Sequence, residues 1–229
     1  FVFVNDMVQL RATHEKAVAC RTLALPYMNP PGERVVIPYG GGHLSGILRK
    51  PQSIERPPVV ILCMGMDSAK EEMSTNEQPF HARGMATLTF DGPGQGEGEY
   101  DFPITPEYEK PVGAVLDYID TRDDIDGTRV GIWGVSFGGY YAPRALAYHR
   151  RIRACIAISG PFEFFSHVQE GGELTEVFAR RSHASGHDET LAVAKRVDMS
   201  EAVKEITQPL FVVAGEYDTL TPPKHQKRL

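Results

Sequence analysis

The chain has 229 residues, of which 41% are hydrophobic and 24% charged, and its formal net charge at pH 7 is −6. These values are ordinary for a soluble globular protein with one domain, or one domain and a sizeable insertion. The acidic balance and the lack of a basic stripe argue against nucleic-acid binding. No apolar run approaches the length of a membrane span, so we expect no membrane association.

The three cysteines are Cys20, Cys63 and Cys155. Their odd number and wide spacing argue against a disulfide framework and against a zinc site. We therefore expect reduced and mostly buried thiols in a cytoplasmic protein. The sequence predicts no metal and no cofactor.

The first predicted element is a helix over residues 5–25. Its apolar positions recur at helical spacings and are Met7, Leu10, Ala17, Cys20 and Ala24. A proline-rich linker ends it, so we treat residues 1–32 as an N-terminal helical segment. This helix has no obvious partner before the strands begin.

Residues 33–229 predict an α/β core. Two strands flank the glycines at 40–42 as a hairpin, and continuous apolar runs, typical of strands buried on both faces, follow at 58–64, 86–90, 129–133, 154–158 and 210–214. Helical stretches alternate with them at about 70–83, 107–121 and 137–149. This alternation predicts a doubly wound, mostly parallel sheet.

The alternation breaks between residues 160 and 208, where the chain is polar and charged. We expect this span to form a cap inserted over the carboxyl ends of the strands. It contains two predicted short helices, at 188–196 and 200–206.

A G-x-S-x-G pentapeptide spans residues 134–138. Ser136 follows a predicted strand and precedes a predicted helix, which is the context that a nucleophile on a strand-to-helix turn requires. Such a turn strains the serine backbone, and Gly134 and Gly138 remove side chains that would clash with it. A chance match in a turn is the alternative, but the flanking elements favour Ser136 as the catalytic nucleophile.

Two further strand ends carry candidate residues. Attack on a carbonyl needs donors for the oxyanion, and we expect them to be the backbone N–H groups of Phe137 and Met66, with Gly65 permitting the geometry of the loop. Asp218 follows the last predicted strand and suits the carboxylate that orients a catalytic histidine. Glu216 is the weaker alternative to Asp218.

The glycine-rich stretch at residues 91–98, DGPGQGEG, is also at a strand end. It superficially resembles a phosphate-binding loop, but its proline and its acidic residues argue against phosphate. We interpret it as a structural turn at the rim of the site.

Together, these motifs resemble the α/β-hydrolase superfamily. The closer resemblance is to the group of 2,6-dihydroxypseudooxynicotine hydrolase, fungal polyketide-shortening hydrolases and fermentation-respiration-switch-type esterases. It extends from about residue 17 to the end and rests on the segments 25–31, 64–72, 91–96, 134–140 and 215–218. It implies a serine hydrolase whose N-terminal helical segment helps to cover the site. Lys70, Glu71 and Glu72 match a charged signature of the group, although a charge cluster at a helix N-terminus explains them equally well.

The sequence offers no suitable histidine for the general base that Ser136 needs. None of the eight histidines fits; His167 lies in the cap, and His225, inside the helix expected after Asp218, should point away from the strand ends. The base of this fold follows one more helix and strand, of about ten and five residues. We therefore expect the catalytic histidine beyond Leu229.

Three functions remain open on the sequence. The first is a serine hydrolase that cleaves a C–C bond next to a ketone, which we favour slightly on the resemblance alone. The second is a carboxylesterase or lactonase, and the third is a non-catalytic α/β-hydrolase-like binding protein. The expected partner is a small-molecule carbonyl compound, and a homodimer is left open.

Overall fold

A seven-stranded sheet forms the centre of the computed structural model, which describes residues 6–171 and 174–229. Its strands are β1 (Gly32–Tyr39), β2 (Gly42–Arg49), β3 (Pro58–Cys63), β4 (Ala86–Phe90), β5 (Asp126–Val135), β6 (Ile152–Ile158) and β7 (Leu210–Val213). The spatial order is β1-β2-β4-β3-β5-β6-β7. The pairs β1–β2 and β2–β4 are antiparallel and the other pairs are parallel. The predicted hairpin and mostly parallel α/β sheet are confirmed.

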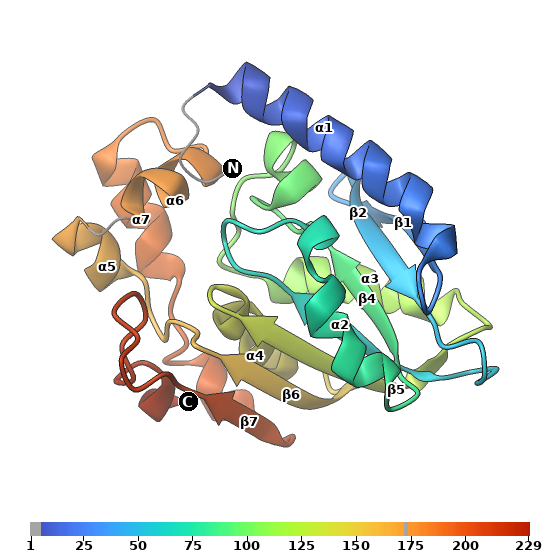
Figure 1. Ribbon diagram of the computed structural model, residues 1–229. Helices are drawn as coiled ribbons and strands as arrows, with labels where there is room; N and C mark the ends of the chain where they lie inside the picture. The colour runs from blue at the N-terminus through green and yellow to red at the C-terminus, as the bar shows by residue number, and fades with distance from the viewer. Residues whose placement is uncertain (1–5, 172–173) are drawn as a thin grey trace.

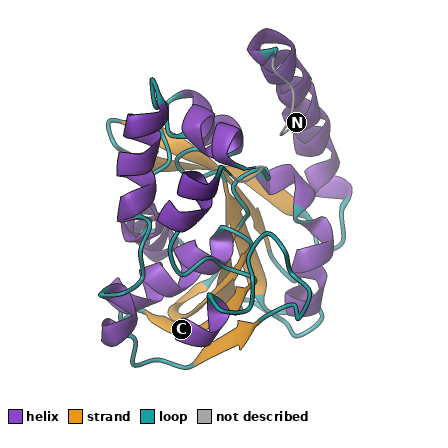
Figure 2. Ribbon diagram, turned by 90° about the vertical axis from the view of Figure 1, so that its left-hand side faces the viewer, coloured by secondary structure: helices purple, strands orange, loops and turns teal. Residues whose placement is uncertain are grey.

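Helices cover both faces of this sheet (Figures 1 and 2). One face packs against α3 (Glu109–Asp120) and α4 (Gly138–Tyr148), and the other packs against α2 (Ser74–His81). Successive residues of β3 alternate between these layers, so that Ile61 joins the α3/α4 core and Leu62 joins the α2 side with Trp133. This alternation explains why β3 is apolar throughout, as the sequence predicted.

The N-terminal helix α1 (Met7–Ala24) crosses the upper side of the molecule in Figure 1. Asp6 caps it by accepting hydrogen bonds from the N–H groups of residues 8 and 9. Asn5, the predicted start, lies outside the described residues. The apolar spacing predicted the helix correctly but not its buried face, because Met7 is 41% exposed and His14 is buried.

The cysteines agree with the expectation only in part. Cys63 and Cys155 are buried in strands, whereas Cys20 is exposed on α1. The expectation of burial was wrong for Cys20 because the α1 surface that contacts the core is built on other residues, including Leu10 and His14.

Among the described residues, three α-helices lie between β6 and β7 and gather at one side of the molecule (Figure 1). They are α5 (Phe165–Glu170), α6 (Thr175–Arg181) and α7 (His187–Arg196). The sequence predicted α7 but missed α5 and α6, which have six and seven residues and no side-chain cap. Such short helices depend on packing rather than on local propensity. The second predicted cap helix is only a 3₁₀ turn at Ala202–Glu205.

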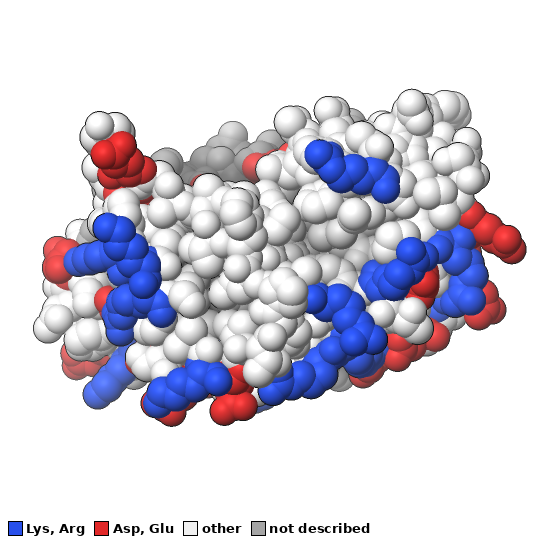
Figure 3. All heavy atoms as spheres, turned by 90° about the horizontal axis from the view of Figure 1, so that it is seen from below, with Lys and Arg blue, Asp and Glu red and all other residues white. Residues whose placement is uncertain are grey.

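Seen from below, the surface has a broad uncharged centre with Lys and Arg side chains in separate groups around it (Figure 3). Asp and Glu side chains lie beside most of these groups. Across residues 6–171 and 174–229, no helix has both the length and the apolar character that crossing a membrane would require.

Candidate active site

Ser136 lies on a sharp turn between β5 and α4. Its φ is +56°, a left-handed conformation that is rare for a residue with a side chain. Its N–H donates to the carbonyl of Ile158 at 2.9 Å, which ties the turn to β6. A Cβ on Gly134 would lie 1.9 Å from the carbonyl oxygen of Gly138, and a Cβ on Gly138 would lie 2.1 Å from that of Cys63. The predicted need for both glycines is confirmed.

The loop after β3 lies directly against Ser136. A Cβ on Gly65 would be 3.4 Å from Ser136 Oγ. Gln95 Nε2 donates to the carbonyls of Met64 and Gly65 at 2.9 and 2.8 Å. In a trans peptide the carbonyl of one residue and the N–H of the next point in opposite directions. The bond from Gln95 to Gly65 therefore fixes the direction of the Met66 N–H, which is the expected oxyanion donor.

Two buried side chains complete this support. Tyr108 donates its hydroxyl hydrogen to Gln95 Oε1 at 2.6 Å. Arg181, which comes from α6 in the cap, donates to the carbonyls of Met66 and Gly94 at 2.7 and 2.8 Å. The loop after β3 is thus held by the glycine-rich turn at 91–98 on one side and by α6 on the other.

Lys70 lies in a buried ionic cluster beneath the loop. Its Nζ is 2.7 Å from Asp91, 2.8 Å from Glu71 and 2.5 Å from Glu97. Burial alone would lower the pKa of Lys70, but the Asp91 and Glu71 carboxylates outweigh it and the pKa lies above its ordinary value. The ammonium is therefore charged and offsets part of the negative charge of the three carboxylates.

The same cluster reaches the N-terminal helix and the antiparallel strands. His14 Nε2 on α1 lies 3.7 Å from Glu71, and Arg34 on β1 lies 2.6 Å from Glu97. Ligand atoms of His14, Glu71 and Asp91 fall within 4.8 Å of one another, close enough to hold a metal. Lys70 already supplies the cation there, so these residues do not fit a metal site.

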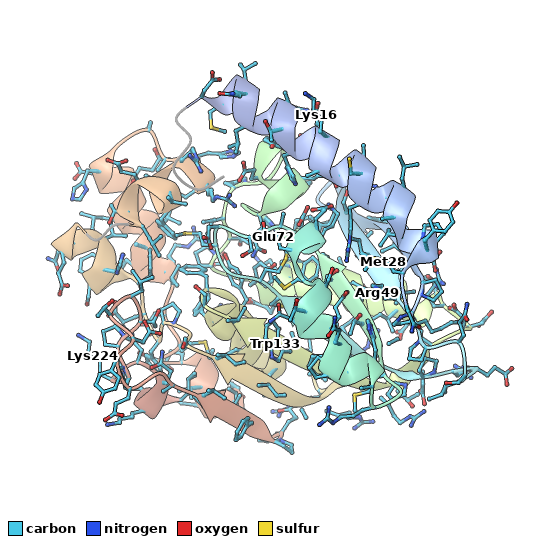
Figure 4. All side chains as sticks on the ribbon, viewed as in Figure 1. Lys16, Met28, Arg49, Glu72, Trp133 and Lys224 are labelled. Carbon is cyan, nitrogen blue, oxygen red and sulfur yellow. The ribbon has the colours of Figure 1, made fainter. Side chains whose placement is uncertain are left out.

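Glu72 has a different environment from Lys70 and Glu71. Its only hydrogen bond among the described residues comes from the Ala69 N–H at 3.3 Å. Burial raises the pKa of Glu72, and the Asp67 carboxylate adds to the effect. Glu72 and Asp67 line a cavity of about 70 Å³ that α1 and Arg181 close. Figure 4 shows Glu72 below α1, and the residue is exposed at the surface.

Asp218 lies in the loop after β7. Its Oδ1 accepts hydrogen bonds from the N–H groups of Leu220 and Thr221 at 3.0 and 2.8 Å. Within residues 6–171 and 174–229, no hydrogen bond joins Asp218 to a histidine. The structure thus places Asp218 in a folded turn at a strand end without showing a base beside it.

Two histidines share a cavity with Ser136. They are His167 of α5 and His225, which precedes a short 3₁₀ turn at Gln226–Arg228. The expectation that His225 points away from the strand ends was wrong. The chain after Asp218 forms turns rather than a regular helix, and it folds back so that the Phe162 N–H donates to His225 Nδ1 at 3.2 Å. The cavity measures about 20 Å³, which is room for about one water molecule.

Some of the side chains that support the loop after β3 could be inferred from the sequence, and others could not. Asp91 and Gln95 belong to the glycine-rich stretch, whose place at a strand end was a usable signal for a supporting role. Arg181 carried no signal, because it lies in a short cap helix without a readable pattern.

The model of the prolyl oligopeptidase family matches residues 71–229. The chain belongs to this family of α/β-hydrolases. It is 32% identical over 196 residues to 2,6-dihydropseudooxynicotine hydrolase of Paenarthrobacter nicotinovorans, covering 85% of this chain and 53% of the relative. It is 34% identical over 180 residues to the α/β hydrolase xenA of Xenoacremonium sinensis, covering 71% of this chain and 41% of the relative.

The crystal structure of 2,6-dihydroxy-pseudo-oxynicotine hydrolase superimposes on this chain with a TM-score of 0.90 and 30% sequence identity. The superposition covers 97% of this chain and 64% of the hydrolase chain. The resemblance inferred from the motifs is therefore confirmed. The chain spans about half the length of the first curated relative and less of the second.

Proposed function

We propose that this chain carries the nucleophile and the oxyanion site of a serine hydrolase that acts on a small carbonyl compound. The observation that carries the proposal is the geometry of Ser136. A serine in a left-handed conformation on a strand-to-helix turn, with a braced glycine loop against its hydroxyl, is the arrangement that nucleophilic catalysis needs.

Each residue then has a distinct role. Ser136 Oγ attacks the carbonyl carbon, and a histidine base takes the hydroxyl proton. The oxyanion accepts hydrogen bonds from the N–H groups of Phe137 and Met66. The bond to the leaving group breaks, the leaving group takes the proton, and water hydrolyses the acyl-enzyme to a carboxylic acid. Asp218 is proposed as the carboxylate that orients the base.

The bond that breaks is either a C–C bond next to a ketone or an ester bond. The hydrolase group that the chain resembles favours the first. A carbon leaving group must receive a proton, and Glu72 is our candidate donor in place of the histidine, because its pKa is raised and it lines a cavity next to the loop after β3. The proton that the histidine took from Ser136 then returns to the Glu72 carboxylate. Gly65 has a supporting role, because its lack of a side chain lets the loop lie against Ser136. The Lys70–Glu71 ion pair also has a supporting role, because it lies in the ionic cluster next to the loop.

A carboxylesterase or lactonase is the second candidate, because the same nucleophile and donors serve an alcohol leaving group. A non-catalytic binding protein is the third. It stays open from the sequence, and no contact among the described residues favours it.

Labelling of the full-length protein by a fluorophosphonate tests the nucleophile. We expect labelling of the wild type and none of Ser136→Ala. Ser159→Ala is the matched control, because Ser159 is also at a strand end with a positive φ, of +49°, but does not line the cavity. Labelling that persists in Ser136→Ala would rule out Ser136. A wild type that is not labelled would favour the binding protein.

The reaction class is tested with p-nitrophenyl esters and aryl β-diketones as substrates. A hydrolase specific for C–C bonds releases an acid and a ketone from the diketone. Turnover of the esters alone would select the carboxylesterase. In the first case we expect Glu72→Gln to slow diketone cleavage more than ester cleavage, because the p-nitrophenolate released from these esters leaves without a proton, whereas a carbon leaving group needs one.

A further inference from the structure

A row of aromatic rings lines the cavity beside Ser136. The ring of Phe137, the residue after the nucleophile, meets the ring of Phe164 edge-on at 5.0 Å. Phe164 in turn stacks on the imidazole of His167 at 4.8 Å with an interplanar angle of 19°. This chain of rings fixes the imidazole in orientation and places it in the same cavity as Ser136.

The Nε2 atom of His167 is buried and has no hydrogen-bond partner among the described residues. A buried polar atom without a partner is unfavourable, and native proteins rarely leave one without a reason. Burial lowers the pKa of His167, although the carboxylates of Glu170 and Glu163 oppose the shift. The ring is therefore neutral at pH 7, and Nε2 can donate or accept according to its tautomer.

His225 lines the same cavity but differs from His167 in its hydrogen bonding. Its Nδ1 already accepts a hydrogen bond from the Phe162 N–H, so this histidine helps to hold the loop. Its neighbours include Glu163, Lys224, Arg228 and His167, and burial lowers its pKa. Of the two cavity histidines, His167 is thus the one with a buried nitrogen that lacks a partner among the described residues.

We propose that His167 is a substrate-positioning residue, whose Nε2 forms a hydrogen bond with an oxygen that the substrate carries beside the carbonyl attacked by Ser136. The inference rests on the proposed function, because it places the reacting carbonyl at Ser136. The cavity walls around His167 include the carboxylate residue Glu163 beside the apolar Phe164 and Leu174, so the preferred group is a neutral hydroxyl or keto oxygen rather than an anion. The cavity holds about one water molecule, so substrate entry requires the cap or the loop around His225 to move.

Two variants distinguish the contribution of the His167 nitrogens from that of its aromatic ring. His167→Phe keeps an aromatic ring against Phe164 and removes both nitrogens, whereas His167→Gln restores a polar group near the position of Nε2. His187→Phe is the matched control, because His187 is an exposed cap histidine at the start of α7 and does not line the cavity. All variants are made in the full-length protein.

The probes are p-nitrophenyl 3-hydroxybutyrate and p-nitrophenyl butyrate, which differ by one oxygen. We expect the wild type and His187→Phe to favour the hydroxy ester in kcat/KM, and His167→Phe to lose about tenfold of that preference. His167→Gln should recover part of it. Labelling of Ser136 by a small fluorophosphonate should proceed at the same rate in the wild type and in His187→Phe, which confirms that the control keeps an intact nucleophile.

A His167→Phe enzyme with the wild-type preference, or a wild type without any preference, would overturn the role of His167. Equal losses on both esters would also overturn it, because they would show a general structural effect. Failure of the proposed function has a different signature. Neither ester would then be hydrolysed, and Ser136 would not be labelled in the wild type.

Discussion

Ser136 shows how much of a site a short motif can specify. Its positive φ is unfavourable by about 1 kcal/mol or more for a residue with a side chain, and the bond from its N–H to Ile158 helps to hold that conformation. The two flanking glycines could be interpreted from the sequence because the steric demand is local. The partner on the other side of the turn, the carbonyl of Cys63, belongs to a strand more than 70 residues away in the sequence.

Gly138→Ala should destabilise the fold strongly. The added Cβ would lie 2.1 Å from a backbone oxygen of β3, so either the strand or the helix must shift. We expect a loss of about 3 kcal/mol or more in the free energy of unfolding, measured by urea denaturation. Gly186→Ala is the control, because nothing lies within 4 Å of a Cβ at that position. Equal stability of the two variants would contradict the packing argument.

The loop at 64–67, which carries the proposed oxyanion donor Met66, depends on the turn that follows β4. The Gln95 side chain joins the turn at 91–98 to the loop at 64–67 and orients the Met66 N–H. Gln95→Leu keeps a similar volume and removes both hydrogen bonds. We expect a fold close to the wild type and a fluorophosphonate labelling rate at Ser136 that falls by about 10- to 100-fold.

Two comparisons make the Gln95 experiment specific. Tyr108→Phe removes the bond to Gln95 Oε1 but leaves both loop contacts, so its labelling rate should lie between those of the wild type and Gln95→Leu. Gln52→Leu changes an exposed glutamine and should have no effect. A wild-type labelling rate in Gln95→Leu would show that Met66 does not need this support.

Removing the charge of Lys70 from the buried ionic cluster should lower the stability of the fold strongly. Lys70→Met leaves the fully buried Asp91 carboxylate without its cation, and we expect a loss of about 3–5 kcal/mol in the free energy of unfolding. Lys50→Met breaks a partly exposed pair with Asp124 and should lose at most about 1 kcal/mol. Thermal or urea unfolding of both variants distinguishes the two cases. Similar losses would mean that the cluster is not a buried electrostatic unit.

Elements differed in how well their sequences predicted them. The parallel strands were predictable because burial on both faces makes them apolar throughout, as in β3. The helix expected over 70–83 is split into a 3₁₀ turn at Lys70–Glu72 and α2, since Asp91 binds both the N–H and the ammonium of Lys70. That bond joins residues 21 positions apart, so no local pattern could report it.

At the scale of the molecule, the sheet brings together residues that the sequence could only name separately. The carboxyl ends of β3, β5 and β6 place the oxyanion loop, Ser136 and the start of the cap side by side. The position of His225 could not be predicted, because it depends on turns that pack against the cap. The same is true of α1, whose buried contacts are with distant polar residues such as Glu71 and Tyr100.

A hydrogen-bonded chain between α2 and the sheet gives the fold a dependence on pH. His81 Nε2 lies 2.8 Å from Thr87 Oγ1, which donates to Glu77, and Glu77 pairs with the buried Arg49 at 2.6 Å. Burial, with a smaller effect from the Arg49 charge, lowers the pKa of His81 to about 4. The unfolded chain, with a histidine pKa of about 6.5, therefore binds more protons between these two values.

Stability should consequently fall as the pH drops from about 6.5 towards 4. Because His81 is only half-buried, solvent screening reduces its contribution, and we expect a loss of about 1 kcal/mol between pH 7 and pH 5. Urea unfolding at the two pH values measures it. His81→Gln, which keeps a hydrogen-bonding group but does not titrate, should lose about 1 kcal/mol less than the wild type over this interval. His187→Gln removes an exposed histidine and should keep the wild-type dependence. If His81→Gln and the wild type show the same dependence, protonation at His81 does not weaken the contact between α2 and β4.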